Sequence, residues 1–190
     1  MTADTILYGG SFDPIHLGHL VIANEAYDAT DCTSVLFVPT WQNPFKTDRG
    51  STAYDDRLAM VKAATHDNPR FAVSEIEREL GDPSYSMRTV KALADGHRPW
   101  FLIGEDLVPE LPHWQEHERL LASVRLLVAT RGGTPRFPLP HGAIAVPNPA
   151  LDLSSGEIRR RLRVGRTIRY LVPQQVHDYI RVKQLYQSTA

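Results

Sequence analysis

The stretch that decides the fold is Gly9 to Leu20, "GGSFDPIHLGHL", which follows the short apolar run "TILY" at residues 5–8. Two glycines end the run, and His16 and His19 then stand three residues apart where a helical pattern begins. A strand, a glycine turn and a helix N-terminus in succession are typical of an α/β fold. Because N–H groups point outward at a helix N-terminus and the helix dipole favours an anion, the stretch also predicts a phosphate site.

Apolar runs of strand length recur after this first unit. They are nearly continuous and rich in β-branched or aromatic residues, as in strands buried on both faces of a parallel sheet; they lie at 34–39, 70–76, 99–104, 124–130 and 143–147. Helix-period segments separate most of them, at 17–29, 55–65, 86–95 and 114–122. We therefore predict a Rossmann-like, doubly wound α/β domain over residues 1–150, with the strand order left open. In the first helix we expect a buried stripe of Leu17, Leu20, Val21 and Asn24, with Ala23 beside it.

The last forty residues change character, and we predict a small helical subdomain at 151–190 that packs on the sheet as part of one compact unit. One helix is expected to begin in "SSGEIRRRL", capped by Ser154 or Ser155, and another after Pro173. Two long loops rich in Pro, Gly and Thr, at 40–53 and 131–141, are candidate substrate loops.

Composition narrows the class of protein. The chain has 190 residues, a net charge of −1 and one cysteine, Cys32. A net charge near zero argues against a protein whose main function is to bind the nucleic-acid backbone. A single cysteine allows no intrachain disulfide. No apolar run approaches membrane-spanning length, and the N-terminus lacks the basic segment of a signal peptide. We expect a cytoplasmic protein that binds neither nucleic acid nor membrane and that could form a homo-oligomer.

The two histidines lie on one helical face, about one turn apart, so both can reach one phosphate. Gly18 between them removes a side chain and lets a flat base or ribose approach the backbone. The stretch fits neither G-x-G-x-x-G nor the P-loop pattern. Zinc binding by the two histidines is disfavoured, since no third or fourth ligand lies nearby in the sequence. The string "HWQEH" at 113–117 fits the zinc-peptidase pattern H-x-x-E-H, but a match over only five residues occurs by chance.

Several strings resemble a known family, the nucleotidyltransferases with an (H/T)xGH signature, and within it the bacterial nicotinate-nucleotide adenylyltransferases. Gly9 to His19 meets the opening pattern GG(T/S)FDPxHxGH, and "LSSGEIR" at 153–159 approximates ISSTxIR, with Gly156 in place of threonine. Four more segments match in part, with Asn43 and Phe45 among the departures: "VPTWQNPFK", "PSYSMRTV", "FLIGEDLVPELPHW" and "RYLVPQQVHDYI".

The resemblance implies adenylyl transfer from ATP to nicotinate mononucleotide, a step of NAD biosynthesis, with Mg²⁺ held by phosphates and waters rather than by a protein cage. The implied catalytic residues are His16, His19, Lys46 and Arg159. The implied ATP-binding residues are Gly9, Gly10, Ser11, Phe12, Gly18, Gly104, Asp106, Ser154, Ser155 and Ile158. The implied mononucleotide-binding residues are Trp41, Tyr85, Ser86, Trp114 and Arg131, with Trp114 stacked on the pyridine ring.

Other activities stay open from the sequence. The acceptor could be nicotinamide mononucleotide or phosphopantetheine, the transferred group could be cytidylyl, and a non-catalytic nucleotide-binding regulator is a further alternative. The basic run "RRRLRVGRTIR" at 159–169 is read as a solvated face apart from Arg159, with an RNA-binding strip as the rival interpretation.

Overall fold

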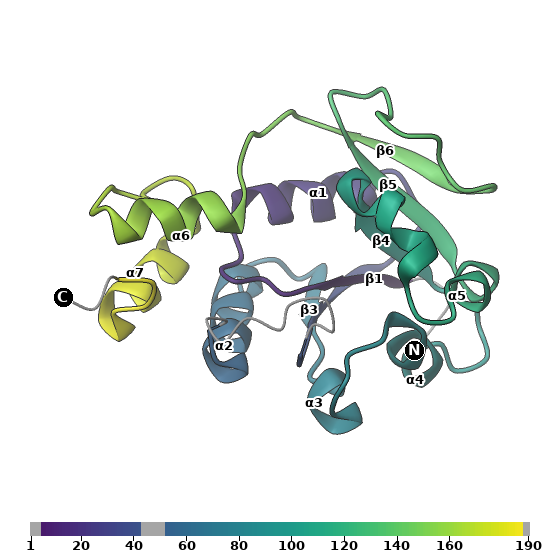
Figure 1. The fold of residues 1–190 in the computed structure, drawn as a ribbon, viewed down its shortest axis with the longest axis horizontal. Helices are drawn as coiled ribbons and strands as arrows, with labels where there is room; N and C mark the ends of the chain where they lie inside the picture. Colours follow the sequence, from purple (N-terminus) through teal and green to yellow (C-terminus); the bar gives the residue numbers. More distant parts are fainter. Residues whose placement is uncertain (1–4, 43–51, 188–190) are drawn as a thin grey trace.

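A computed structural model describes residues 5–42 and 52–187, and its centre is a six-stranded parallel sheet (Figure 1). The strands lie in the order β3-β2-β1-β4-β5-β6. Their bounds are β1 Thr5–Gly10, β2 Ser34–Pro39, β3 Phe71–Val73, β4 Trp100–Gly104, β5 Arg125–Arg131 and β6 Ile144–Asn148. The predicted doubly wound α/β class is confirmed, and the order, which the sequence left open, reverses direction between β1 and β4.

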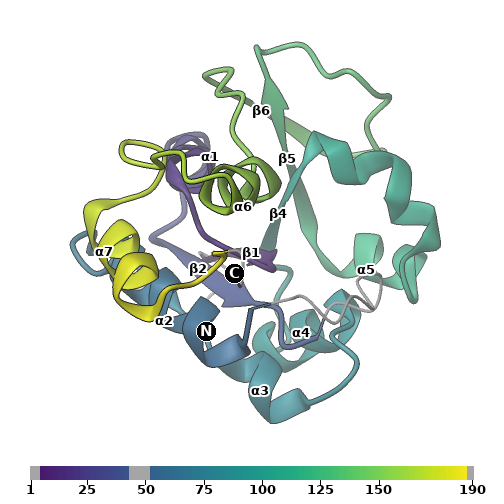
Figure 2. The ribbon, with the colours of Figure 1, turned by 60° about the vertical axis from the view of Figure 1, so that its left-hand side comes forward.

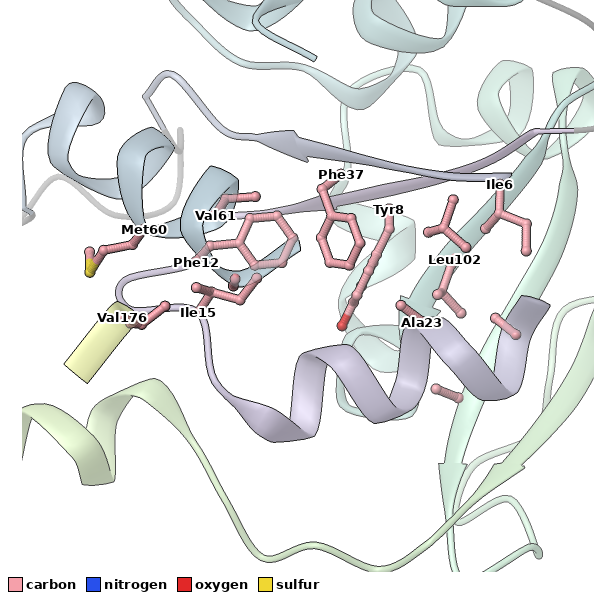
Figure 3. Close-up of a cluster of buried hydrophobic side chains, with 14 of the residues drawn as sticks. Ile6, Tyr8, Phe12, Ile15, Ala23, Phe37, Met60, Val61, Leu102 and Val176 are labelled. Carbon is pink, nitrogen blue, oxygen red and sulfur yellow. The ribbon is translucent and has the colours of Figure 1, made fainter. Parts of the chain in front are cut away.

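Alternate residues of the strands face two separate cores. Ile6 and Tyr8 point into one core, where they meet Phe37 and Leu102, while Leu7 points into the other. Figure 3 shows the first core, with the rings of Tyr8, Phe12 and Phe37 above Ala23 of the first helix. Because both faces of the sheet are covered, the strands read as continuous apolar runs in the sequence.

Helices cover the two faces as the crossovers require. The first core is closed by α1 (Leu17–Asp28), α2 (Tyr54–Thr65), α6 (Ser155–Arg163) and α7 (Gln174–Lys183). The second is closed by α3 (Ile76–Leu80), α4 (Ser86–Leu93), the 3₁₀ helix η1 (Glu105–His113) and α5 (His117–Ser123).

Three local predictions need correction. The strand expected at 70–76 is only three residues long, because α3 begins at Ile76. The helix expected at 114–122 begins at His117, since Pro109 and Pro112 hold the preceding segment in a 3₁₀ helix. In α1 the fully buried residues are Gly18, Ala23 and Ala26 rather than the larger apolar ones, because small side chains let the helix lie close to the sheet.

In Figure 1 the C-terminal helices α6 and α7 lie on the side away from α4 and α5, and Figure 2 shows α7 beside α2. Ser154 caps α6 as predicted: its hydroxyl oxygen accepts a hydrogen bond of 3.2 Å from the Glu157 N–H. The α7 helix packs on α2, where the Tyr179 hydroxyl donates to Asp56 over 2.8 Å. Ile158, Val176 and Ile180 extend the first core into this segment. The division of the chain at residue 150 stays a prediction.

No helix in the described ranges 5–42 and 52–187 is long and apolar enough to cross a membrane.

Candidate active site

The candidate site lies at the carboxyl ends of β1 and β4, where the strand order reverses. In open α/β sheets the crevice at this point is the place where ligands bind. The segment from Ser11 to His16 leaves the end of β1, and Gly104 to Asp106 leaves the end of β4. Residues of the first signature and of the segment after β4 therefore leave neighbouring strands at the same edge of the sheet.

A tight turn joins β1 to α1, and Gly10 makes it possible. Phe12 has a positive φ of 48° and is buried. Its ring atoms lie 3.0 to 3.3 Å from the place where a Cβ on Gly10 would stand, so a larger residue would displace the ring. The Phe12 side chain therefore belongs to the core, and only its backbone could meet a nucleotide. Gly9 has open space around its Cα.

The rings of His16 and His19 are stacked, with centroids 3.7 Å apart and planes tilted by 22°. His19 Nδ1 accepts a hydrogen bond of 3.2 Å from the backbone N–H of His16. Since Nδ1 acts as an acceptor, the proton of the neutral His19 ring is on Nε2. The geometry thus presents His19 Nε2–H as a donor from the start of α1.

Gly18 makes room for this stack. The His16 ring atoms Nδ1 and Cε1 lie 3.0 and 3.1 Å from where a Gly18 Cβ would stand. The space that the sequence assigns to an approaching base or ribose is therefore filled by the His16 ring. Any side chain at position 18 would push this ring away from His19.

Both rings are held neutral. Burial lowers the pKa of His16 to about 4, and the positive charge of Arg131 contributes. Burial among Tyr8 and Phe12, followed by the nearby charge of His16, holds the pKa of His19 well below its usual range. At neutral pH the pair therefore offers hydrogen-bond donors rather than two cations.

His16 Nδ1 is buried and has no hydrogen-bond partner among the residues that the structure describes. An unpaired polar atom of this kind costs about 1–3 kcal/mol, and such atoms in folded proteins commonly mark a functional position or a bound water.

The N-terminus of α6 meets the same turn from the other side. The Ser155 hydroxyl donates to the carbonyl oxygen of Pro14 over 2.9 Å, and Arg159 Nη1 donates to the carbonyl oxygen of Asp13 over 2.6 Å. Two residues of α6 thus hold the Asp13–Pro14 dipeptide, which stands shortly before the start of α1 at Leu17. These contacts fasten the start of α6 to the turn that precedes α1, and a helix N-terminus is a favourable place for phosphate.

Asp13 stands in the same turn and is not among the residues predicted for the site. Its carboxylate is buried and accepts hydrogen bonds from the Tyr186 hydroxyl, at 2.6 Å, and from the Thr52 N–H, at 3.4 Å. In the sequence, Asp13 stands inside the pattern GG(T/S)FDPxHxGH, but no role was predicted for it. Its partner, Tyr186, lies beyond the end of α7 at Lys183, and the contact between the two could not be predicted from the sequence.

Arg57 was also missed. It is buried at the start of α2 and donates to three backbone carbonyls: Ser11 at 2.7 Å, Thr52 at 3.0 Å and Trp41 at 3.1 Å. Arg57 thus joins the end of β1 to both segments that flank residues 43–51. The sequence signal for its burial was the position of this basic residue within the apolar pattern of the helix.

On the β4 side, the buried carboxylate of Glu105 orders the start of the 131–141 loop. It accepts hydrogen bonds from the backbone N–H groups of Arg131, at 3.0 Å, and Arg136, at 3.1 Å, and from Arg136 Nε, at 2.9 Å. Although burial favours the protonated form, these donors hold the pKa of Glu105 below its usual value. Sequence analysis chose its neighbour Asp106 and overlooked Glu105.

Asp106 is exposed beside Gly104, whose missing Cβ leaves room for the carboxylate. Burial raises the pKa of Tyr8, and the negative charge of Asp106 raises it further. The Tyr8 ring in turn packs edge-on against His19, with centroids 6.3 Å apart. The Arg131 guanidinium is exposed and lies 3.8 Å from Asp152.

The remaining predicted residues lie in different surroundings. The Trp41 ring contacts Tyr54, with centroids 4.8 Å apart, and the half-buried Trp114 packs edge-on against Phe101 at 6.5 Å. Tyr85 and Ser86 form the start of α4. Lys46 lies outside the described residues.

Ile158 requires a correction. Its side chain is fully buried in the first core, and its backbone N–H donates to the Ser154 carbonyl within α6. It positions the helix and has no atom free to bind ATP.

Comparisons with known proteins agree with this geometry. Residues 7–161 match the family described as cytidylyltransferase-like. A relative from Geobacillus kaustophilus, described as a probable nicotinate-nucleotide adenylyltransferase, is 40% identical over 183 residues, which cover 95% of this chain and 84% of the relative. A relative of the same description from Herpetosiphon aurantiacus is 40% identical over 192 residues, with 95% and 96% covered.

Solved structures agree in fold. The nicotinic acid mononucleotide adenylyltransferase of Plasmodium falciparum complexed with NaAD superposes with a TM-score of 0.78 at 22% identity, covering 96% of each chain. The same protein complexed with APC superposes with a TM-score of 0.76 at 21% identity.

Proposed function

This chain belongs to the nicotinate-nucleotide adenylyltransferases, within the cytidylyltransferase-like family, and from that premise we propose that it transfers the adenylyl group of ATP to nicotinate mononucleotide. The products are deamido-NAD and pyrophosphate, a step of NAD biosynthesis. The observation that carries the proposal is the stacked pair of His16 and His19, which faces the N-terminus of α6 across the Asp13–Pro14 dipeptide.

The reaction needs no covalent intermediate with the protein. A phosphate oxygen of the mononucleotide attacks the α-phosphorus of ATP, and the bond from that phosphorus to the bridging oxygen of the β-phosphate breaks, so pyrophosphate leaves with the bond's electron pair. Two anions must approach each other, and catalysis therefore consists mainly of positioning and charge stabilisation.

We assign the phosphates to the groups at the two helix N-termini. Nε2–H of His19 donates to the α-phosphate, where charge develops in the transition state, and His16 donates beside it. Their neutrality suits this role, because a neutral donor of fixed orientation stays in place over a wide pH range.

On the α6 side, the backbone N–H groups of the first turn and the remaining donors of Arg159 contact the β- and γ-phosphates. The Ser155 hydroxyl, engaged by the Pro14 carbonyl, positions this helix, and Ser154 caps it. Lys46 is proposed to approach the same phosphates from its own segment.

The other half of the site is assigned to nicotinate mononucleotide. Trp114 offers a ring face to the pyridine, and Trp41 flanks the site from the end of β2. Backbone groups at Tyr85 and Ser86 are proposed to read the pyridine substituent, and Arg131 to hold the mononucleotide phosphate. The influence of Arg131 on the pKa of His16 supports its closeness to the reacting groups. Asp106 is assigned to a ribose hydroxyl.

The divalent ion belongs to the nucleotide in this proposal. Among the described residues no group of three His, Cys, Asp or Glu could hold a metal ion, and the donors at the site are largely N–H groups. Mg²⁺ would therefore be held by phosphate oxygens and waters, and it would neutralise charge on the triphosphate. A cytoplasmic location, where ATP is available and Cys32 stays reduced, completes the proposal.

The first experiment is a product assay on the purified chain. Mg·ATP is incubated with nicotinate mononucleotide, nicotinamide mononucleotide or phosphopantetheine, and pyrophosphate and the adenylylated product are followed together. The proposal requires a strong preference for the nicotinate substrate. Pyrophosphate release with another acceptor would show that the reaction is correct but the substrate is not nicotinate mononucleotide. ATP binding without pyrophosphate release would favour a non-catalytic regulator.

A further inference from the structure

A second concave site lies behind the C-terminal end of α6, between that helix, the loop at 165–168 and α7. Its cavity volume is about 270 Å³. Its apolar floor consists of Leu162, Ile168 and Ile180, and its rim carries Arg166, Arg181 and His177. A volume of this size suits a ligand smaller than a nucleotide, since pockets for drug-sized molecules start at roughly 300 Å³.

The rim is strongly basic in an otherwise balanced chain. Residues 153–187 carry eight Lys and Arg against two acids, whereas the whole chain has a net charge of −1. Glu157 is engaged by Arg160 and Arg161 on the surface of α6, at 2.7 and 3.2 Å. The remaining acid is Asp178.

Asp178 only partly offsets the charge at the pocket. It accepts a hydrogen bond from Gln174 over 3.0 Å and lies 3.5 Å from His177 and 3.9 Å from Arg181. The guanidinium of Arg166 has no hydrogen bond or ion pair within the part of the chain that the structure describes. The pocket therefore holds at least one uncompensated cation beside a second that is weakly paired.

The loop that carries Arg166 is fixed by its own hydrogen bonds. Arg161 Nη1 donates to the Thr167 carbonyl over 3.1 Å, and the Arg166 N–H donates to the Arg161 carbonyl over 2.8 Å. Thr167 Oγ1 accepts from the Arg169 N–H over 3.1 Å, which leaves its O–H proton free to donate. Thr167, Arg166 and Arg181 all line the pocket, and because the loop is held by these hydrogen bonds, little ordering of its backbone is needed when an anion binds.

We propose that this pocket binds a small phosphate monoester, with the phosphate between Arg166, Arg181 and Thr167 and a short apolar group on the floor of Leu162, Ile168 and Ile180. Guanidinium forks suit phosphate oxygens in pairs, and the hydroxyl adds a further donor. The apolar floor favours an ester that carries a hydrocarbon group over inorganic phosphate alone.

The pocket is separate from the site of adenylyl transfer. Leu162 lies seven residues beyond Ser155 along α6, roughly 10 Å at 1.5 Å per residue. The proposal concerns binding at the opposite end of this helix, so it does not depend on which mononucleotide the enzyme accepts.

Nuclear magnetic resonance of the full chain tests the proposal. Inorganic phosphate and phenyl phosphate are titrated in turn, and the backbone amide signals of Gly165, Thr167 and Gln187 report the pocket, while those of Gly18 and His19 report the nucleotide site. The test variant is R166A/R181A. The matched control is R169A/K183A, which removes two neighbouring positive charges that do not line the pocket.

We expect phenyl phosphate to bind more tightly than inorganic phosphate, as judged from the concentration at which the pocket signals shift. R166A/R181A should weaken this binding at least about tenfold, as the loss of charge-assisted hydrogen bonds predicts, and the control should change it less than about twofold. Equal weakening in both variants would overturn the proposal in favour of a diffuse basic surface, the kind that nucleic acid uses. Absence of pocket shifts in the intact chain at millimolar ester would also overturn it.

Discussion

The hydroxyl of Tyr186 donates a hydrogen bond of 2.6 Å to Oδ1 of Asp13, across 173 residues of chain. Burial and the Asp13 carboxylate raise the pKa of Tyr186. Through this contact the segment after α7 holds the turn that precedes His16. The carbonyl of the same Asp13 accepts a hydrogen bond from Arg159, so a single residue joins the turn before α1 to α6 and to the segment after α7.

Removing this hydroxyl should loosen both helices. In Tyr186→Phe the buried Asp13 oxygen loses its donor, and we expect a loss of about 1–3 kcal/mol in the free energy of unfolding, the cost of an unsatisfied buried acceptor. The KM for ATP should rise more than kcat falls, because the phosphate donors become misplaced while remaining present. Chemical denaturation and steady-state kinetics measure the two effects. Tyr170→Phe is the matched control, since Tyr170 is 79% exposed; equal behaviour of the two variants would contradict the role of Asp13.

His19 is expected to act in the transition state. His19→Ala should lower kcat about 100-fold or more, the usual effect of removing one donor to a developing charge. His19→Gln keeps an amide donor and should retain part of the activity. Single-turnover kinetics at saturating ATP gives the comparison, with His66→Ala as a surface control and circular dichroism as the check on folding. Turnover at the native rate in His19→Ala would remove the residue from the mechanism.

Glu105 should control the mononucleotide half of the site. Glu105→Gln places an amide N–H₂ among three N–H donors, and because a buried, paired carboxylate is lost we expect about 3 kcal/mol of destabilisation. The Arg131 backbone is then released, so the KM for nicotinate mononucleotide should rise while the KM for ATP changes little. Glu110→Gln, at an exposed position of η1, provides the control. A selective rise in the KM for ATP would be the opposite of this expectation.

The neutral His16 predicts a specific pH dependence of stability. Its folded pKa, about 4, lies below the usual value of 6.5, so the unfolded chain binds the proton first as the pH falls. The folded state therefore loses stability between about pH 6.5 and pH 4, by up to roughly 3 kcal/mol for this group. Denaturation of the native chain and of His16→Gln at pH 7.5 and 4.5 measures the difference. A drop of equal size in both proteins would assign the effect to other groups; His66→Gln should follow the native chain.

The sequence predicted the parts of the fold that depend on local pattern. Continuous apolar runs marked the buried strands, and Ser154 marked the start of α6 through its capping oxygen. The strand order could not be predicted, because each buried strand is apolar on both faces, and this pattern does not indicate which strand lies beside it. The 3₁₀ helix η1 was missed, since two prolines within nine residues read as loop.

Short motifs drew attention to some of the candidate residues, and contacts between distant parts of the chain added others; the roles of all of them stay predictions. His16, His19 and Arg159 stand in short strings that can be read directly. Asp13, Arg57 and Glu105 act through backbone carbonyls and N–H groups far along the chain, so only the folded structure reveals their partners. Burial likewise could not be read from the motif at Ile158. The motif suggested that this residue binds ATP, whereas its side chain is buried in the core.

The tie between Asp13 and Tyr186 also affects how the protein is made. The histidine pair leaves the ribosome early, but α6 and the residue that fastens the turn emerge more than a hundred residues later. At ordinary rates of synthesis, about 5–20 residues per second, many seconds separate the two. Throughout that interval the nascent chain has only part of the site proposed for the triphosphate, so we expect ATP to bind there only after α6 and Tyr186 have been synthesised.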